Sequence, residues 1–333
     1  MKKVLYISLL SVFFLGVITS CTKEKLDSES VFVNRNIEQN DFDKYIEREY
    51  TKEYNIGLIY KYVDIESDMN YNLSPAKYES SVRLGKLIKY LAIEPYNEVT
   101  GGKDFIKSYF PKVLSFIGSP AYRNNGTMII GTAEGGRKIT MFNVNALDEE
   151  TGVEKEFLNE FFFHTIHHEF GHILHQTKPY STSFNEISDK DYVFDSWNTE
   201  FSGVAGAVEK GFISPYAGSE PNDDFVEILS FYITSTEDEW EERVNSGVTS
   251  IEDTLEDLWD NRDEYEDDEF AEEVADAVSR LEAAEEARVR LLEKIDIVKS
   301  YLDNSWDIDI DELRAEIQNR LDALDDFDQT SLN

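Results

Sequence analysis

All five histidines of the chain lie in one segment, HTIHHEFGHILH, which spans residues 164–175. Within it, His168, Glu169 and His172 form an H-E-x-x-H motif, and the apolar spacing around the segment predicts a helix from about Glu154 to Gln176. Residues four apart lie on the same face of a helix, so both imidazoles can bind one zinc ion. Glu169 would lie beside that ion and act as a general base on its water. This motif therefore predicts a helix and a zinc site together.

Other pairings of the histidines fit less well. His164 and His168 are also four residues apart, but Thr165, which follows His164, cannot serve as a base. His175 lies about one turn beyond a metal held by the motif, so we expect it to support a ligand or to pack. His167 points about 100° away from His168 on a helix and is expected to be structural or near the rim of a cleft.

A catalytic zinc takes three protein ligands and keeps one position open. No histidine lies outside the cluster, so the third ligand should be a carboxylate. Asp223 and Glu227 are four residues apart on a second predicted helix, from Asp223 to about Thr234, and therefore share a face. One would bind zinc while the other orients His168 through its far ring nitrogen. An acidic helix N-terminus that merely suits the helix dipole is the alternative explanation, and the sequence does not decide which carboxylate reaches the metal.

The remaining periodicity predicts an α+β fold, in which a small sheet and the active-site helix precede a largely α-helical, acidic C-terminal region. Expected strands lie at 56–63, 113–117, 127–130 and 138–144, and the last of these is expected to form a cleft edge on which a peptide could pair. Further helices are expected at 43–50, at 74–91 with a cap at Ser74 and Pro75, and through most of 237–333. A stripe of Val289, Leu292, Ile295, Val298 and Leu302 predicts an amphipathic helix there.

The start of the chain predicts export. Residues 1–20 have two lysines, an apolar run and small residues, as a signal peptide does. Cys21, the only cysteine, follows Ile18-Thr19-Ser20 in a pattern that resembles a bacterial lipobox, so we expect Cys21 to be lipidated. An ordinary cleaved signal and an uncleaved anchor are the alternatives. Residues 21–40 would form a polar tether, 41–235 the metal-binding domain and 236–333 the acidic helical region.

The net charge of −36 argues against nucleic acid as a partner, because the phosphate backbone binds through Lys and Arg. The negative charge also argues against peripheral binding to anionic lipid. The charge is concentrated at the end of the chain, since residues 237–333 contain 34 of the 68 acidic residues and 9 of the 32 basic ones.

The two carboxylate positions resemble those of gluzincins, a class of zincin-like metallopeptidases, and more closely the lethal-factor-like branch. In that branch a tyrosine lies seven residues before the third ligand, as Tyr216 does before Asp223. The resemblance implies that Tyr216 stabilises the oxyanion of the tetrahedral intermediate and that Glu227 supports a ligand. This chain departs from the branch in having Asp at position 223, where Glu is usual, so Glu227 stays open as the alternative ligand.

The mature chain also resembles a narrower family, the substrate import-associated zinc metallohydrolase lipoproteins. The resemblance is carried by EYNIGLIYKY, NGTMIIGTAEGGRKI, HHEFGHILHQ, GFISPYA, DDFVE and IVKSYLDNSWDIDIDELR. It covers residues 41–235 well and the C-terminal helices in part, while the acidic stretch 244–285 is unlike the family. It implies a zinc hydrolase, most simply a peptidase acting on a peptide or protein, anchored by its lipid in the outer membrane near a TonB-dependent importer. Three alternative interpretations remain: a non-catalytic substrate-binding partner of such an importer, a zinc hydrolase that acts on a non-peptide bond, and a structural lipoprotein without metal.

Overall fold

The structure is a computed structural model that describes residues 38–62, 71–122, 128–129, 131–134 and 137–333. The expected signal peptide (1–20), Cys21 and most of the expected tether (21–40) lie outside these residues, as do Val63, Thr127 and Ile130 from two expected strands. Residues 40–333 form one compact unit with a mixed α+β fold. None of the helices in the described ranges is both long enough and apolar enough to span a bilayer.

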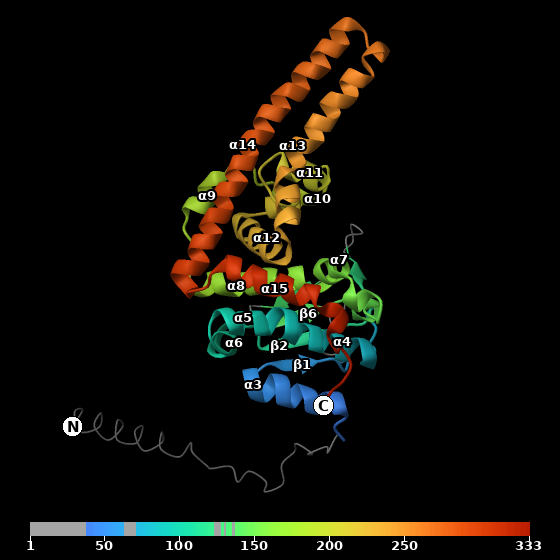
Figure 1. The fold of residues 1–333 in the computed structure, drawn as a ribbon, viewed down its shortest axis with the longest axis vertical. Coiled ribbons are helices and arrows are strands. Elements are labelled where there is room, and N and C mark those ends of the chain that lie inside the picture. Colours follow the sequence, from blue (N-terminus) through green and yellow to red (C-terminus); the bar gives the residue numbers. More distant parts are fainter. Residues whose placement is uncertain (1–37, 63–70, 123–127, 130, 135–136) are drawn as a thin grey trace, which may run out of the picture. The chain divides into compact units, whose positions relative to one another are not determined.

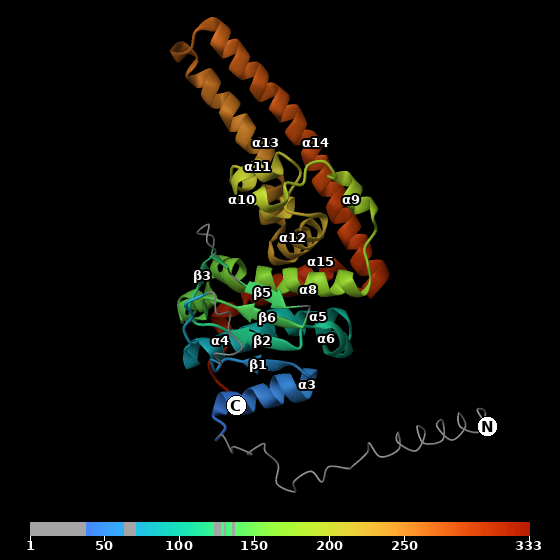
Figure 2. The same cartoon turned by 180° about the vertical axis from the view of Figure 1, so that it is seen from behind.

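A four-stranded sheet lies in the lower half of the view in Figure 1. Its order is β1-β2-β6-β5, and Figure 2 labels all four strands. Its strands are β1 (Gly57–Ile59), β2 (Val113–Phe116), β6 (Lys138–Met141) and β5 (Gly131–Glu134). The first three are parallel, and β5 runs antiparallel to β6. A separate pair is formed by β3 (Ala121–Tyr122) and β4 (Met128–Ile129).

The expectation that 138–144 forms the edge of the sheet is wrong. β6 lies between β2 and β5, and its residues Ile139, Thr140 and Met141 are all buried. Continuous burial of this kind is typical of a strand that is covered on both faces. The edge strand is β5, and Gly131 in it allows α8 to approach closely, since a Cβ there would lie 2.4 Å from Thr165 Cγ2.

Helices of the N-terminal half cover the sheet. They are α2 (Asp41–Ile46), a π-helical turn (Glu47–Thr51) and α3 (Lys52–Tyr54), then α4 (Tyr78–Ile88), a second π-helical turn (Lys89–Ile93), α5 (Glu94–Val99) and α6 (Asp104–Tyr109). The predicted cap at Ser74 and Pro75 is wrong, because α4 begins at Tyr78. Ser74 accepts a hydrogen bond from the Gly118 N–H, and Pro75 forms a bridge with Ile117, so this segment is extended.

One nearly continuous helical segment carries all five histidines. It consists of α7 (Lys155–Leu158), a π-helical turn (Asn159–Phe163) and α8 (His164–Thr177), which matches the predicted span closely. Its apolar face, with Ile166, Phe170 and Leu174, is buried in the main core. α8 also contacts β5 and, more extensively, α12 (Pro221–Thr234), which begins with a proline in its first turn (Figure 2).

Short elements connect α8 to α12. They are α9 (Ser183–Ile187), α10 (Trp197–Glu200), α11 (Gly203–Val208) and 3₁₀ turns at Phe194–Ser196 and Tyr216–Gly218. Further 3₁₀ turns lie elsewhere in the chain, at Val144–Ala146, Thr151–Val153, Arg262–Glu264 and Leu324–Asp326.

Three helices complete the chain: α13 (Glu237–Asp260), α14 (Asp267–Trp306) and α15 (Ile310–Asp322). α13 and the first part of α14 form a hairpin with its own apolar cluster, around Ile251 and Phe270 (Figure 1). The end of α14 and α15 instead contribute to the main core. Within the predicted stripe of α14, Val289 and Leu292 are exposed, at 60% and 39%, and Leu291 is buried in their place.

The close contact between α8 and α12 depends on Gly171. A Cβ at this position would lie 2.9 Å from Val226 Cγ1 and 3.2 Å from Val226 Cβ. Val226 is fully buried, and a β-branched side chain in a helix has little rotamer freedom, so it cannot turn aside. The two backbones can therefore approach only because residue 171 has no side chain.

We predict that Gly171→Ala lowers the free energy of unfolding by ~1–3 kcal/mol, as measured by urea denaturation. Alanine favours a helix interior by ~1 kcal/mol relative to glycine, but the overpacking against Val226 should outweigh this gain. Val226→Ala removes the closest methyl group, so the double variant should lose less stability than the sum of the two single variants. Gly102→Ala is the control, because its Cβ would enter open space. Additive losses in the double variant would contradict this account.

Candidate metal centre

Three ligand atoms converge where α8 faces the start of α12. His168 Nε2 and His172 Nε2 are 3.2 Å apart. Asp223 Oδ1 lies 3.2 Å from His172 Nε2 and 3.8 Å from His168 Nε2. A tetrahedral zinc with bonds of ~2.0–2.1 Å requires ligand atoms ~3.3 Å from each other. Two imidazole nitrogens and one carboxylate oxygen at these separations therefore fit a zinc ion.

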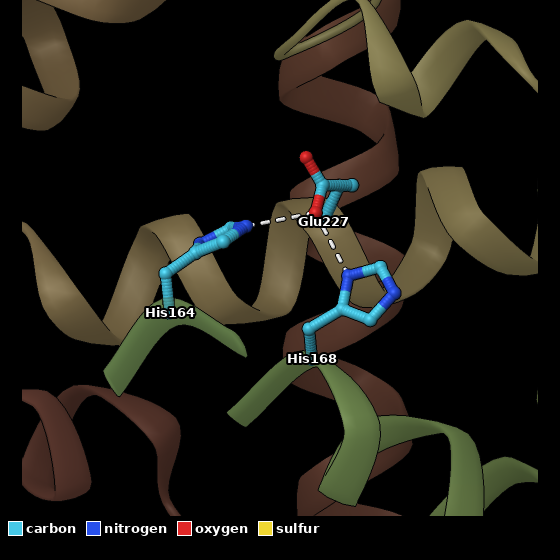
Figure 3. A group of neighbouring side chains, drawn as sticks. All are labelled: His164, His168 and Glu227. Carbon is cyan, nitrogen blue, oxygen red and sulfur yellow. Dashed lines mark hydrogen bonds and ion pairs between the residues drawn. The ribbon is translucent and has the colours of Figure 1, made fainter. Parts of the chain in front are cut away.

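Glu227 lies behind His168, on the side away from these atoms. Its Oε1 accepts hydrogen bonds of 2.8 Å from both His168 Nδ1 and His164 Nε2, and Figure 3 shows both rings directed at this carboxylate. Ser214 Oγ donates to the other oxygen, Oε2. Burial alone would raise the pKa of Glu227, but His164 and His168 outweigh it and hold that pKa well below its usual range. Glu227 is thus an anion whose hydrogen bonds fix the orientation of His168.

His164, His168 and Glu227 also lie close enough together to be considered as a metal group. However, their nitrogen and oxygen atoms are in direct hydrogen-bond contact at 2.8 Å. An ion between them would have to push these atoms to ~3.3 Å apart. The geometry therefore favours hydrogen bonds in this group and an ion in the group of His168, His172 and Asp223.

His172 has a corresponding support. Its Nδ1 lies 2.9 Å from Nε2 of His175, one turn further along α8. Burial, and then the charge of His172, lowers the pKa of His175 to about 4, so His175 is neutral near pH 7 and can accept a hydrogen bond. The two histidines of the motif therefore each use Nδ1 for a protein partner and leave Nε2 for a metal.

The first turn of α12 is held by buried polar contacts. Ser219 Oγ donates to Asp223 Oδ2 at 2.8 Å, which orients that carboxylate. The next residue, Asp224, points the other way and forms an ion pair of 2.6 Å with Lys294 of α14, in which both side chains are fully buried. Tyr192 O–H donates to the same oxygen of Asp224 at 2.8 Å. Because a buried charge is costly unless paired, these contacts fix the position of α12 relative to α14.

The remaining predicted residues lie beside the ligand atoms. Burial raises the pKa of Glu169, although the nearby His168 and His172 oppose this shift. The ring of Tyr216 lies 5.8 Å from that of His168, centroid to centroid, and packs edge-on against Trp197 at 5.1 Å. The structure thus places a carboxylate of raised pKa and a phenol at the same centre as the three ligand atoms.

Three partners of the centre, His164, Ser214 and Ser219, were not predicted from the sequence. His164 was set aside as a metal ligand, yet it holds Glu227; its spacing of four from His168 is the signal that could have shown this. Ser214 gave no signal in the sequence. His167 is fully buried, with its Nδ1 3.2 Å from the hydroxyl of Tyr96, and belongs to the core.

The fold and the ligand set are those of a zinc-binding protein of the metallopeptidase class. Residues 35–311 match the sequence profile of a family described as "Putative zinc-binding metallo-peptidase", and the chain belongs to this family. A crystal structure of a protein with that same description, from Bacteroides caccae, is similar, with 32% sequence identity and a TM-score of 0.68. The similarity covers 91% of this chain and 100% of that one. A comparison with curated proteins gives no match.

We predict that variants of Asp223 and of Glu227 differ in zinc content, as measured by elemental analysis of the purified proteins. His172→Ala and Asp223→Ala should lose the metal, whereas Glu227→Gln should keep it with an affinity weakened by ~10–100-fold, as expected for a residue that supports a ligand. Glu186→Gln, outside the centre, serves as the control for handling losses. Loss of zinc with Glu227→Gln and retention with Asp223→Ala would instead assign the metal to the group around His164.

Proposed function

We propose that the protein is a zinc-dependent peptidase. The observation that carries this proposal is the convergence of His168 Nε2, His172 Nε2 and Asp223 Oδ1 at separations that suit a tetrahedral zinc ion. We assign it to the gluzincin-like enzymes, and the candidate ligand set of two histidines and one carboxylate, with aspartate at the third position, supports this assignment. When bound, zinc acts as a Lewis acid that polarises water and the substrate carbonyl.

Glu169 is proposed as the general base. It follows His168 directly on α8, so it lies beside the ligand atoms rather than among them. A carboxylate whose pKa is raised by burial accepts a proton from water more readily than an exposed one. Glu169 then passes this proton to the leaving amine, which makes it both acceptor and donor in one cycle.

Tyr216 is proposed to stabilise the negative charge that develops on the substrate oxygen. It lies beside His168, and its position is set by the 3₁₀ turn Tyr216–Gly218 and by Trp197. The Ser214 hydroxyl accepts a hydrogen bond from the Ala217 N–H at 3.1 Å while donating to Glu227, which connects this turn to the ligand support. A tyrosine whose ring is held in this way needs little rearrangement when negative charge develops on the substrate oxygen.

An extended peptide substrate is proposed to pair with β5. This strand is at the edge of the sheet and lies next to the start of α8 (Figure 2). Edge strands offer unpaired N–H and C=O groups that can bind a peptide by strand addition. The proposal moves the expected substrate-binding edge from 138–144 to residues 131–134.

We further propose that the enzyme is exported and anchored in the outer membrane through lipid on Cys21, close to a TonB-dependent importer. The sequence of residues 1–21 and the resemblance to importer-associated lipoproteins support this. Metabolic labelling with an alkynyl fatty acid tests the anchor, since Cys21→Ser should abolish the label.

We predict that Glu169→Gln keeps zinc and lowers the rate of peptide hydrolysis by ~10²–10⁴-fold. The amide is nearly isosteric with the carboxylate but cannot accept the proton. The measurement is cleavage of a mixed peptide library followed by mass spectrometry, with zinc content determined on the same samples. Hydrolysis as fast as that of the unaltered protein would refute the mechanism. Binding of peptides without any turnover by the unaltered protein would support the alternative of a non-catalytic partner of an importer.

We predict that Tyr216→Phe lowers kcat by ~10²-fold while leaving KM nearly unchanged, because the lost hydrogen bond forms only in the transition state. The steady-state parameters are determined on a peptide found in the library experiment. Trp197→Phe is the control for altered packing around the ring. A rise in KM with kcat unchanged would show that Tyr216 binds substrate instead of stabilising the transition state.

A further inference from the structure

A cavity of about 750 Å³ borders the metal centre on the N-terminal side of α8. Its lining includes His164, Ser214, Pro215, Phe231 and Arg243. His164 and Ser214 are the residues that hold Glu227, and Pro215 directly precedes Tyr216. The ring of His164 lies 6.1 Å from that of His168, so the cavity begins about one helical turn from the ligand atoms. A residue of extended peptide spans ~3.3 Å, so this separation equals about two residues of backbone, or one residue together with a long side chain.

Two cations line this cavity, Lys155 on α7 and Arg243 on α13. Lys155 pairs with Asp322, which leaves Arg243 as the cation to consider. Its guanidinium lies over the ring of Phe231, 4.0 Å from the centroid. In the described part of the chain it makes one hydrogen bond, from Nη1 to the Ile213 carbonyl at 3.4 Å, and has no carboxylate within 4 Å. Arginine has five N–H donors, so most of them are without a protein acceptor here. Burial lowers the pKa of Arg243, and the charges of Glu227 and then Glu239 oppose this shift although neither carboxylate lies within 4 Å of the guanidinium.

Arg243 differs from the other arginines that lie over an aromatic ring. Among the described residues, four more arginines lie over an aromatic ring, and each of them also pairs with a carboxylate. They are Arg48 with Glu49, Arg262 with Asp267, Arg314 with Glu237 and Arg320 with Glu94. Arg243 has the same stacked geometry without the anion. Its guanidinium donors are therefore suited to a carboxylate or to a group of the same shape and charge.

Exposed glutamates also line the cavity, namely Glu156, Glu160, Glu239 and Glu242. None of them lies within 4 Å of the guanidinium, and Glu239 already accepts a hydrogen bond of 2.6 Å from the Thr236 N–H. They would disfavour a small free anion that approaches from solution. A carboxylate on a peptide already held at the metal centre would meet the same repulsion, but its high local concentration would offset that cost.

We propose that this cavity is a substrate subsite that binds a carboxylate of the peptide through Arg243. This inference rests on the proposed peptidase function, since it names the class of substrate that the same centre would take. The carboxylate can come from an acidic side chain next to the scissile bond or from the free C-terminus of the peptide. Planar, bidentate binding of a carboxylate is the recognition for which a guanidinium is best suited.

The test uses four peptides built on one sequence that the unaltered enzyme cleaves in the library experiment. In the first pair, one peptide has Glu and the other has Gln next to the scissile bond. In the second pair, the peptide ends at that same position, with a free C-terminus in one peptide and an amidated C-terminus in the other. We expect one carboxylate peptide to have a kcat/KM ~10–100-fold above that of its neutral counterpart, as for a hydrogen bond to a charged group. In Arg243→Met, which keeps an apolar stem over Phe231, this ratio should fall to about one. Arg243→Lys should retain part of this ratio, because lysine keeps the positive charge but lacks the planar guanidinium that binds a carboxylate with two hydrogen bonds.

Arg314→Met is the matched control. Arg314 has the same stacked geometry, over Tyr232, but lies outside the cavity and pairs with Glu237. Its loss should reduce stability and leave the ratio between carboxylate and neutral peptides unchanged. Equal cleavage of all four peptides by the unaltered enzyme, or an undiminished ratio in Arg243→Met, would overturn the proposal.

A binding measurement separates this proposal from the peptidase function itself. The same four peptides are titrated calorimetrically into zinc-loaded Glu169→Gln and into Glu169→Gln/Arg243→Met. If the unaltered protein cleaves nothing, the four peptides are built instead on a library sequence that it binds, and a Kd ratio that depends on Arg243 then supports the subsite while the peptidase function fails. If cleavage occurs and neither the rate ratio nor the Kd ratio depends on Arg243, the function stands and the subsite fails.

Discussion

The contact between α8 and α12 is the interaction on which the metal centre depends. Two ligand atoms come from α8 and the third comes from α12, so the ligand set exists only while these helices stay close. Gly171 permits this approach by leaving room for Val226. Interiors pack as densely as organic crystals, so a single added methyl group between the helices would be felt at the metal centre a few ångströms away.

Hydrogen bonds behind the ligands add a second constraint. His168 and His172 each use Nδ1 for a protein partner, Glu227 in one case and His175 in the other. A ring fixed in this way presents Nε2 in one orientation, which lowers the entropy lost when a metal binds. Glu227 connects three parts of the chain, because it also receives hydrogen bonds from His164 and from Ser214, next to the turn that carries Tyr216.

The C-terminal helices take part in this arrangement although they lie far from the motif in sequence. Lys294 of α14 forms a buried ion pair with Asp224, the residue that follows Asp223. Arg243 of α13 lines the cavity next to His164. The last third of the chain thus both holds α12 in place and contributes the cation that we propose for substrate binding, while the acidic hairpin packs on an apolar cluster of its own.

The sequence alone determined the helix of the histidines, the pair His168 and His172, and the helix of Asp223 and Glu227, because helical spacing of four residues is a local property of the backbone. It also predicted that a carboxylate supplies the third ligand, since no histidine lies outside the cluster at 164–175. Only the tertiary structure decided that Asp223 faces Nε2 of both histidines, that Glu227 lies behind His168, and that β5 and not β6 is the edge strand. It also decided that no carboxylate of the described residues lies within 4 Å of the Arg243 guanidinium. Each of these depends on how separate elements pack, and their register is set by long-range contacts such as that of Gly171 with Val226, which no local pattern contains.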